Sequence, residues 1–277
     1  MSLGLDSWKF AIIYKPVAKC VDKARRISSI LRSKGLSIKL YSVDDALKEE
    51  SIKSDILISV GGDGTLLRIS RIYHSHTPLV LPIPCGRRTA FYEDIKPENY
   101  EEVVEKVLRG EFTIELLIRI KLITKKAEYA VLNEGMIISK NRGRVTGFKI
   151  EVTTPYIKAT YGFEGDGVLI GPSPGSAAYN LSAKGSLLTG DLYGIFITPL
   201  NPMDLVITPL IIPLLSRVVV SSRGYTELYI DGEKAEDLKP YSKVLIEFGG
   251  GSVRLIRLGK KREYIRDIYE KRRFRSR

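Results

Sequence analysis

Residues 56–65 read Ile-Leu-Ile-Ser-Val-Gly-Gly-Asp-Gly-Thr, an apolar run that ends in three glycines around one carboxylate. The apolar run predicts a buried strand, and Thr65 is a candidate cap for a following helix. Clustered glycines indicate close approach to a ligand, and the N–H groups at a helix start suit phosphate. Phosphate repels Asp63 unless the carboxylate binds metal or takes a proton. The stretch therefore predicts phosphoryl transfer to a hydroxyl that Asp63 orients or deprotonates. An ordinary tight turn is the alternative.

Strands and helices alternate around this stretch. Apolar runs predict strands at 10–14, 37–41, 56–60 and 79–83, and helical spacing predicts helices at 17–31 and 65–75. This alternation is typical of a doubly wound parallel sheet. Ligands bind beyond the carboxyl ends of the strands in such sheets, and residues 61–65 lie there.

The pattern changes after a helix predicted at 99–109. The segments that follow are rich in β-branched residues, which is typical of a mainly antiparallel sheet. They are 112–124, 128–139, 145–153, 192–198, 216–222, 225–231, 242–248 and 253–258. We therefore expect an α/β domain over 1–98, a β-rich domain over 99–259, and a C-terminal helix over 260–277 that docks back on the body.

The composition narrows the class of protein. The chain has 277 residues, 44% of them hydrophobic, and no apolar run approaches the ~20 residues that span a bilayer. Cys20 and Cys85 are too few for a disulfide framework, and two Cys with two His support no structural zinc site. We expect a cytoplasmic protein with no membrane partner. The absence of Gln and the abundance of charged residues are a thermophile tendency.

The formal charge of +12 is concentrated at the C-terminus, where nine basic and three acidic residues of 260–277 contribute +6. A nucleic-acid binder is one interpretation. It is the weaker one, because no basic platform with interleaved aromatic residues accompanies the charge. The apolar residues of this segment recur at helical spacing and favour a docked amphipathic helix. They are Tyr264, Ile265, Ile268 and Tyr269.

Three further polar stretches interrupt the second region. Asn133-Glu134 divides an apolar strand and predicts either a ligand site or a strand end at Gly135. A Gly/Pro/Ser loop at 171–185 runs into a short helical segment, which suits an anion or an adenine edge, or forms only a turn. Asp231-Gly232 predicts a hairpin turn.

Taken in order, these stretches resemble the NAD kinase family, whose members phosphorylate the 2′-hydroxyl of the adenosine ribose of NAD. The resemblance covers nearly the whole chain. It rests on Gly61-Gly62-Asp63-Gly64-Thr65, Asn133-Glu134, Asp166-Gly167, Gly175-Ser176-Ala177-Ala178-Tyr179, Ile197-Thr198-Pro199 with Asn201-Pro202, and Asp231-Gly232. It implies the two-domain NAD kinase architecture, with a β-rich nucleotide-binding domain and a C-terminal segment that returns to the first domain.

The resemblance also implies roles for individual residues. Asp63 would be the catalytic base on the 2′-hydroxyl, with ATP, or polyphosphate, as donor and magnesium as the cation, to which we assign no protein ligand. The nucleotide-binding residues would be Gly61, Gly62 and Gly64 at the donor phosphates, Asn133 and Glu134 at the adenosine, Asp166 at the nicotinamide, and Thr65, Arg68, Phe91, Ser176, Ala178, Tyr179 and Ser182 elsewhere in the site. The implied partners are NAD, NADP and ATP, and the implied assembly is a homodimer or homotetramer.

Two segments depart from the family pattern. Pro174 and Ala177 stand where the family has hydroxyl-bearing residues, and a missing polar partner can cost about 1–3 kcal/mol. Residues 82–91 lack the family's Asn but offer Arg87 and Arg88 as candidate phosphate clamps. These departures keep two alternatives open, a kinase for a lipid or nucleoside hydroxyl and a non-catalytic NAD(P)-binding homologue. Retention of Asp63 argues against the second.

Overall fold

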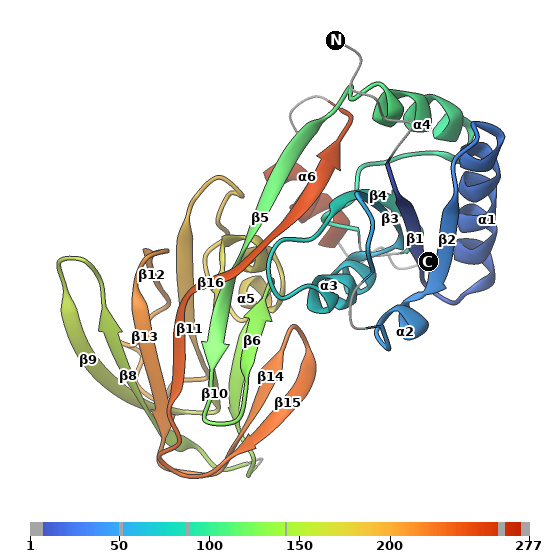
Figure 1. The fold of residues 1–277 in the computed structure, drawn as a ribbon. Helices are drawn as coiled ribbons and strands as arrows, with labels where there is room; N and C mark the ends of the chain where they lie inside the picture. Colours follow the sequence, from blue (N-terminus) through green and yellow to red (C-terminus); the bar gives the residue numbers. More distant parts are fainter. Residues whose placement is uncertain (1–7, 50–51, 87–88, 142, 260–263, 273–277) are drawn as a thin grey trace. The chain divides into compact units, whose positions relative to one another are not determined.

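The computed structural model describes residues 8–49, 52–86, 89–141, 143–259 and 264–272 (Figure 1). The chain forms two compact units, one made of 1–117 with 252–277 and the other of 118–251. The strands β5 (Thr113–Ile123) and β16 (Val244–Arg257) have residues in both units.

The first unit contains a parallel sheet in the order β2-β1-β3-β4, and the end of β16 pairs in parallel with β4. A strand is present at each of the predicted positions, 10–14, 37–41, 56–60 and 79–83. The strands are β1 (Phe10–Tyr14), β2 (Ile38–Ser42), β3 (Ile56–Gly61) and β4 (Leu79–Pro84). The helices are α1 (Ala18–Ser33), α2 (Val43–Ala46), α3 (Asp63–Ile72), α4 (Tyr100–Leu108) after the 3-10 turn η2 (Pro97–Asn99), and α6 (Tyr264–Arg272). The prediction of an α/β domain with a parallel sheet is confirmed.

The boundary between the units lies later in the chain than the position near residue 98 that the composition indicates. The reason is α4, whose apolar side chains share one hydrophobic core with α1, β1 and β3. These side chains are Tyr100, Val103, Val104 and Val107. The second boundary lies at 251/252 and not near residue 259, because Arg254 and Leu255 of β16 pair with β4.

The C-terminal helix is present at 264–272, within the range that the sequence predicts. Its apolar stripe is not buried as a whole. Ile268 is 3% exposed, whereas Ile265 and Tyr269 are about half exposed. The side chain of Tyr264 lies outside the described residues.

The second unit is mainly antiparallel, which confirms the prediction for this region. One sheet has the order β12-β11-β10-β7-β14-β15, and β13 pairs with β8 and with the start of β16. The strands are β6 (Glu128–Val131), β7 (Gly135–Ser139), β8 (Thr146–Thr153), β9 (Lys158–Gly165), β10 (Gly167–Pro172), β11 (Gly194–Leu200), β12 (Leu210–Pro213), β13 (Arg217–Ser222), β14 (Thr226–Ile230) and β15 (Glu233–Leu238). A 3-10 turn, η3 (Ser173–Ala177), and a one-turn helix, α5 (Tyr179–Ser182), follow β10. Apolar side chains of β8, β10, β11, β13 and β14 meet in one core.

The two cysteines are joined. Cys20 in α1 and Cys85, the residue after β4, form a disulfide within the first unit. The composition predicts no framework of disulfides, and the 65-residue separation of this pair gives no local signal in the sequence. The bond ties α1 to the carboxyl end of β4.

Among the described residues, no helix combines the length and the apolar character that crossing a membrane requires.

Candidate active site

The glycine-rich loop after β3 begins α3 two residues earlier than Thr65. Gly62 is extended and precedes the first helical residue, Asp63. The carbonyl of Gly62 accepts the backbone N–H groups of Thr65 at 2.8 Å and Leu66 at 3.2 Å. The prediction that Thr65 caps the helix is therefore wrong, because Gly62 takes the cap position and Thr65 lies buried in the first turn.

Asp63 is held by the backbone of a distant segment. Its carboxylate oxygens accept the N–H groups of Ala90 at 2.9 Å and Phe91 at 3.1 Å. Phe91, which the resemblance assigns to nucleotide binding, is buried and contributes this backbone donor. The arrangement fixes an anionic side chain in the first turn of α3.

The glycines of this loop have different surroundings. A Cβ at Gly61 would overlap the side chain of Thr65, so this glycine is required for packing inside the protein. A Cβ at Gly64 would have no atom within 4 Å, so this position faces open space. Of these two positions, Gly64 is the one that leaves room for a ligand.

Arg68 is engaged by another element. Its guanidinium forms an ion pair at 2.7 Å with the carboxylate of Asp44, which lies in α2. Both side chains are partly exposed, so the pair is weak by the standards of buried pairs. Arg87 and Arg88, the candidate phosphate clamps, lie outside the described residues.

In the second unit, Asn133 and Glu134 form the turn between β6 and β7 and are 8% and 7% exposed. Asp231, which lies much later in the chain, binds the backbone of this turn. Its carboxylate accepts the N–H groups of Asn133 at 2.7 Å, Glu134 at 3.2 Å and Leu132 at 3.3 Å. Asp231 and Gly232 have φ angles of 48° and 85° and close the hairpin of β14 and β15, which confirms the predicted turn.

Buried charges surround this turn. Burial, and then the nearby Asp231, raise the pKa of Glu134 from 4.5 to about 7, against a hydrogen bond from the Tyr179 backbone that lowers it. Burial lowers the pKa of Arg119 to about 10, and Asp231 opposes that shift. Asn133 Oδ1 and Glu134 Oε2 are buried without a hydrogen-bond partner among the described residues. Because unpaired buried acceptors are costly, they indicate a ligand that donates to them.

The loop at 171–179 packs against the same turn. A Cβ at Gly171 or at Gly175 would overlap the backbone carbonyl of Asn133, so both positions require glycine. Asn180, fully buried, accepts the hydroxyl of Thr198 at 2.6 Å and donates to the carbonyl of Ser186 at 2.9 Å. The close approach at the two glycines joins the loop to the turn, and the Asn180 bonds hold the loop on β11, all within one unit.

The other predicted residues of this loop divide into two groups. The hydroxyl of Ser176 is fully buried and bonds to the backbone of Leu188, which assigns it to the fold. Ala178 is partly buried, whereas Tyr179 is 46% exposed and Ser182 is exposed. Asp166 accepts the side-chain amide of Asn201 at 2.8 Å. The sequence does not indicate that Asp231 binds the turn at 132–134 or that Asn180 binds the loop and Thr198. The Asp-Gly pair was a visible signal, but only for a hairpin.

Comparisons with known proteins identify the family of this chain. The family model of the ATP-NAD kinase N-terminal domain matches residues 13–112, and the model of the ATP-NAD kinase C-terminal domain matches residues 132–258. The NAD kinase of Methanothermobacter thermautotrophicus is 27% identical over 270 residues, which is 92% of each chain. The NAD kinase of Aeropyrum pernix is 29% identical over 217 residues, 77% of this chain and 76% of the relative.

Two solved structures share the fold. The structure of an NAD kinase from Archaeoglobus fulgidus in complex with ATP has a TM-score of 0.76 at 20% identity and covers 95% of this chain and 98% of its own. The structure of yeast NADH kinase complexed with NADH has a TM-score of 0.79 at 18% identity and covers 95% and 87%. With both family models matched in order and the fold shared along the chain, this protein belongs to the NAD kinase family.

Proposed function

We propose that this chain is an ATP-dependent NAD kinase that transfers the terminal phosphoryl group of ATP to the 2′-hydroxyl of the adenosine ribose of NAD. The observation that carries the proposal is the orientation of Asp63 in the first turn of α3 by the two amides of Ala90 and Phe91. A binding protein does not need a fixed carboxylate beside a phosphate-binding helix start, whereas phosphoryl transfer to a hydroxyl does.

In the proposed reaction, the 2′-oxygen forms a bond to the terminal phosphorus of ATP as the bond between that phosphorus and the bridging oxygen of ADP breaks. The hydroxyl proton passes to Asp63, and ADP leaves. Phosphoryl transfer depends mainly on positioning and charge stabilisation. The backbone clamp on Asp63 supplies the positioning. Gly64 supplies open space at the helix start, where N–H groups favour phosphate.

For the acceptor, the turn of the second unit supplies buried acceptor atoms. Asn133 Oδ1 and Glu134 Oε2 would take hydrogen bonds from N–H and O–H groups of the adenosine. Exposed Tyr179 and Ser182 lie in α5, which follows the loop that packs against this turn, and Asp166 would serve the nicotinamide side. Loss of the hydroxyls at Pro174 and Ala177 leaves this turn as the main source of base recognition.

Magnesium is part of the proposal. The described residues contain no group of three or more His, Cys, Asp or Glu placed to hold a metal ion. Mg²⁺ commonly binds through one or two carboxylates together with substrate phosphates, so the donor set fits an ion that arrives on ATP with Asp63 beside it. Bound there, it would neutralise charge on the phosphates. We also propose that the chain forms a homodimer or homotetramer, as the family resemblance implies.

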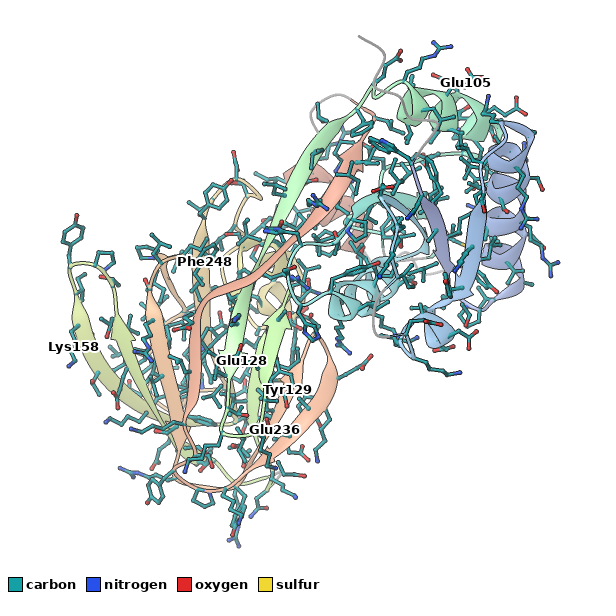
Figure 2. The ribbon with its side chains drawn as sticks, in the orientation of Figure 1. Glu105, Glu128, Tyr129, Lys158, Glu236 and Phe248 are labelled. Carbon is teal, nitrogen blue, oxygen red and sulfur yellow. A yellow bond between two sulfur atoms is a disulfide. The ribbon has the colours of Figure 1, made fainter. Side chains whose placement is uncertain are left out.

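The test is NADP formation by the purified chain with NAD, ATP and magnesium, in the wild type and in Asp63→Asn. We expect turnover to fall about 100-fold or more while NAD binding, measured by calorimetry, is retained. The matched control is Glu105→Gln, which changes an exposed carboxylate of α4 (Figure 2). This carboxylate pairs with Lys34. Full turnover in Asp63→Asn would refute the assigned role. Absence of NADP from the wild type would refute the proposed acceptor, and a panel of other hydroxyl acceptors would follow.

A further inference from the structure

Tyr92 follows directly after the two residues whose amides hold Asp63. It is 2% exposed. Its hydroxyl donates to the carbonyl of Gly62 at 3.0 Å and lies 2.8 Å from the hydroxyl of Ser59. Because the phenol has one proton and gives it to Gly62, the Ser59 hydroxyl must be the donor to Tyr92. The result is a one-way chain of hydrogen bonds from β3, through the phenol, to the residue before Asp63.

The carbonyl that Tyr92 binds is the one that starts α3. Its two other donors, the N–H groups of Thr65 and Leu66, come from α3 itself. Tyr92 is therefore the donor that ties this carbonyl to another segment. That segment is 90–92, and it contacts 62–63 at three points, two on the Asp63 carboxylate and one on the Gly62 peptide.

On the basis of the proposed function, we infer that Tyr92 is a positioning residue for phosphoryl transfer, whose hydroxyl fixes the Gly62–Asp63 peptide and thereby the direction of the Asp63 carboxylate. The amides of Ala90 and Phe91 restrain only the carboxylate end of Asp63, while rotation of the Gly62–Asp63 peptide still changes the direction of the side chain. Fixing the preceding carbonyl removes that freedom. Displacement of a reacting group by about 1 Å can cost about 100-fold in rate, so the contact matters to turnover more than to binding.

Tyrosine suits this position for two reasons. Burial raises the pKa of the phenol far above its ordinary value, so the hydroxyl stays a donor over the whole working pH range. Phenylalanine would fill the same space but leave the Ser59 hydroxyl buried without its acceptor. A simple Tyr92→Phe change thus combines two effects, loss of the Gly62 contact and an unsatisfied serine.

Four variants separate these effects. Ser59→Ala keeps the bond from Tyr92 to Gly62, and we expect near wild-type turnover. Tyr92→Phe should lower kcat about 10-fold or more with KM for NAD within about twofold. Ser59→Ala combined with Tyr92→Phe removes the unsatisfied serine and should recover thermal stability but not kcat. The matched control is Tyr100→Phe, which removes another buried phenol hydroxyl, one without a hydrogen-bond partner among the described residues, and should leave kcat unchanged.

Recovery of kcat together with stability in the double variant would overturn the inference, because Tyr92 would then act only through the core. Wild-type kcat in Tyr92→Phe would overturn it as well. A readout independent of NADP separates this inference from the proposed function. Hydrogen exchange at the amides of Thr65 and Leu66 should be faster in Tyr92→Phe than in Tyr100→Phe, and equal exchange would refute the contact even if the wild type formed no NADP.

Discussion

Reduction of the disulfide between Cys20 and Cys85 should destabilise the first unit. The bond joins residues 65 positions apart, and closing a loop of this length lowers the conformational entropy of the unfolded chain by the equivalent of about 4 kcal/mol. Cys20 is fully buried, so the native packing around it holds the two sulfur atoms near each other even as thiols. Reduction therefore acts mainly by raising the conformational entropy of the unfolded state. For a chain of this size, the resulting loss of stability lowers Tm by on the order of 10 °C.

The assay is thermal unfolding followed by circular dichroism, with and without a phosphine reductant, and with thiol titration to confirm that the bond has opened. The control is a Cys20→Ala, Cys85→Ala variant, whose Tm should not respond to the reductant. The N–H of Cys85 donates to the Gly61 carbonyl at 2.6 Å, so the glycine-rich loop should loosen in the reduced protein as well. Equal Tm values for the oxidised and fully reduced wild type would refute the loop-closure reasoning.

Two further predictions concern the separate units. Since the pKa of Glu134 is raised from 4.5 to about 7, the folded protein holds a proton that the unfolded chain has released, and stability should fall by on the order of 3 kcal/mol as pH rises through this range. Denaturant unfolding at pH 5 and pH 8 should detect the fall in the wild type and a smaller one in Glu134→Gln, and equal pH slopes in the two proteins would contradict it. Gly64→Ala should raise stability by up to about 1 kcal/mol, because alanine favours helices and the position faces open space, while KM for ATP increases. An unchanged KM would mean that the donor phosphates do not approach there.

Four strands of the second unit lie outside the segments that the sequence predicted, namely β9, β10, β12 and β15. β10 and β12 contain apolar runs, so apolar character alone does not decide which strands a sequence reveals. β9 and β15 are edge strands, and edge strands show weaker apolar alternation. In β15 the buried positions are Glu236 and Leu238. Figure 2 labels Glu236 and Tyr129, and the Glu236 carboxylate accepts the hydroxyls of Tyr129 at 2.8 Å and Thr124 at 2.6 Å. A buried carboxylate with hydroxyl partners has no signature in hydrophobic periodicity.

Some residues of the candidate site can also be identified from the sequence, and others cannot. Asp63 and the Asn133-Glu134 pair stand out because a charged or amide side chain interrupts an apolar or glycine-rich run, which local reasoning detects. The sequence does not identify their partners, since Asp231-Gly232 predicts only a hairpin turn. Asp231 binds amides 97 to 99 positions away, and Tyr92 binds a carbonyl 30 positions away. Such pairings depend on strand order, and a single sequence does not specify which distant backbone groups a side chain will meet.

The division of the chain into units has a consequence for its synthesis. The second unit is contiguous and complete once residue 251 has left the ribosome, whereas the first unit still lacks the part of β16 that pairs with β4. Until residues 252–257 emerge, β4 remains an open edge of a parallel sheet, and open edges invite association with other chains. The usual order in which the N-terminal domain folds first is therefore reversed in its last step. The first unit therefore completes its sheet only after the second unit has been synthesised.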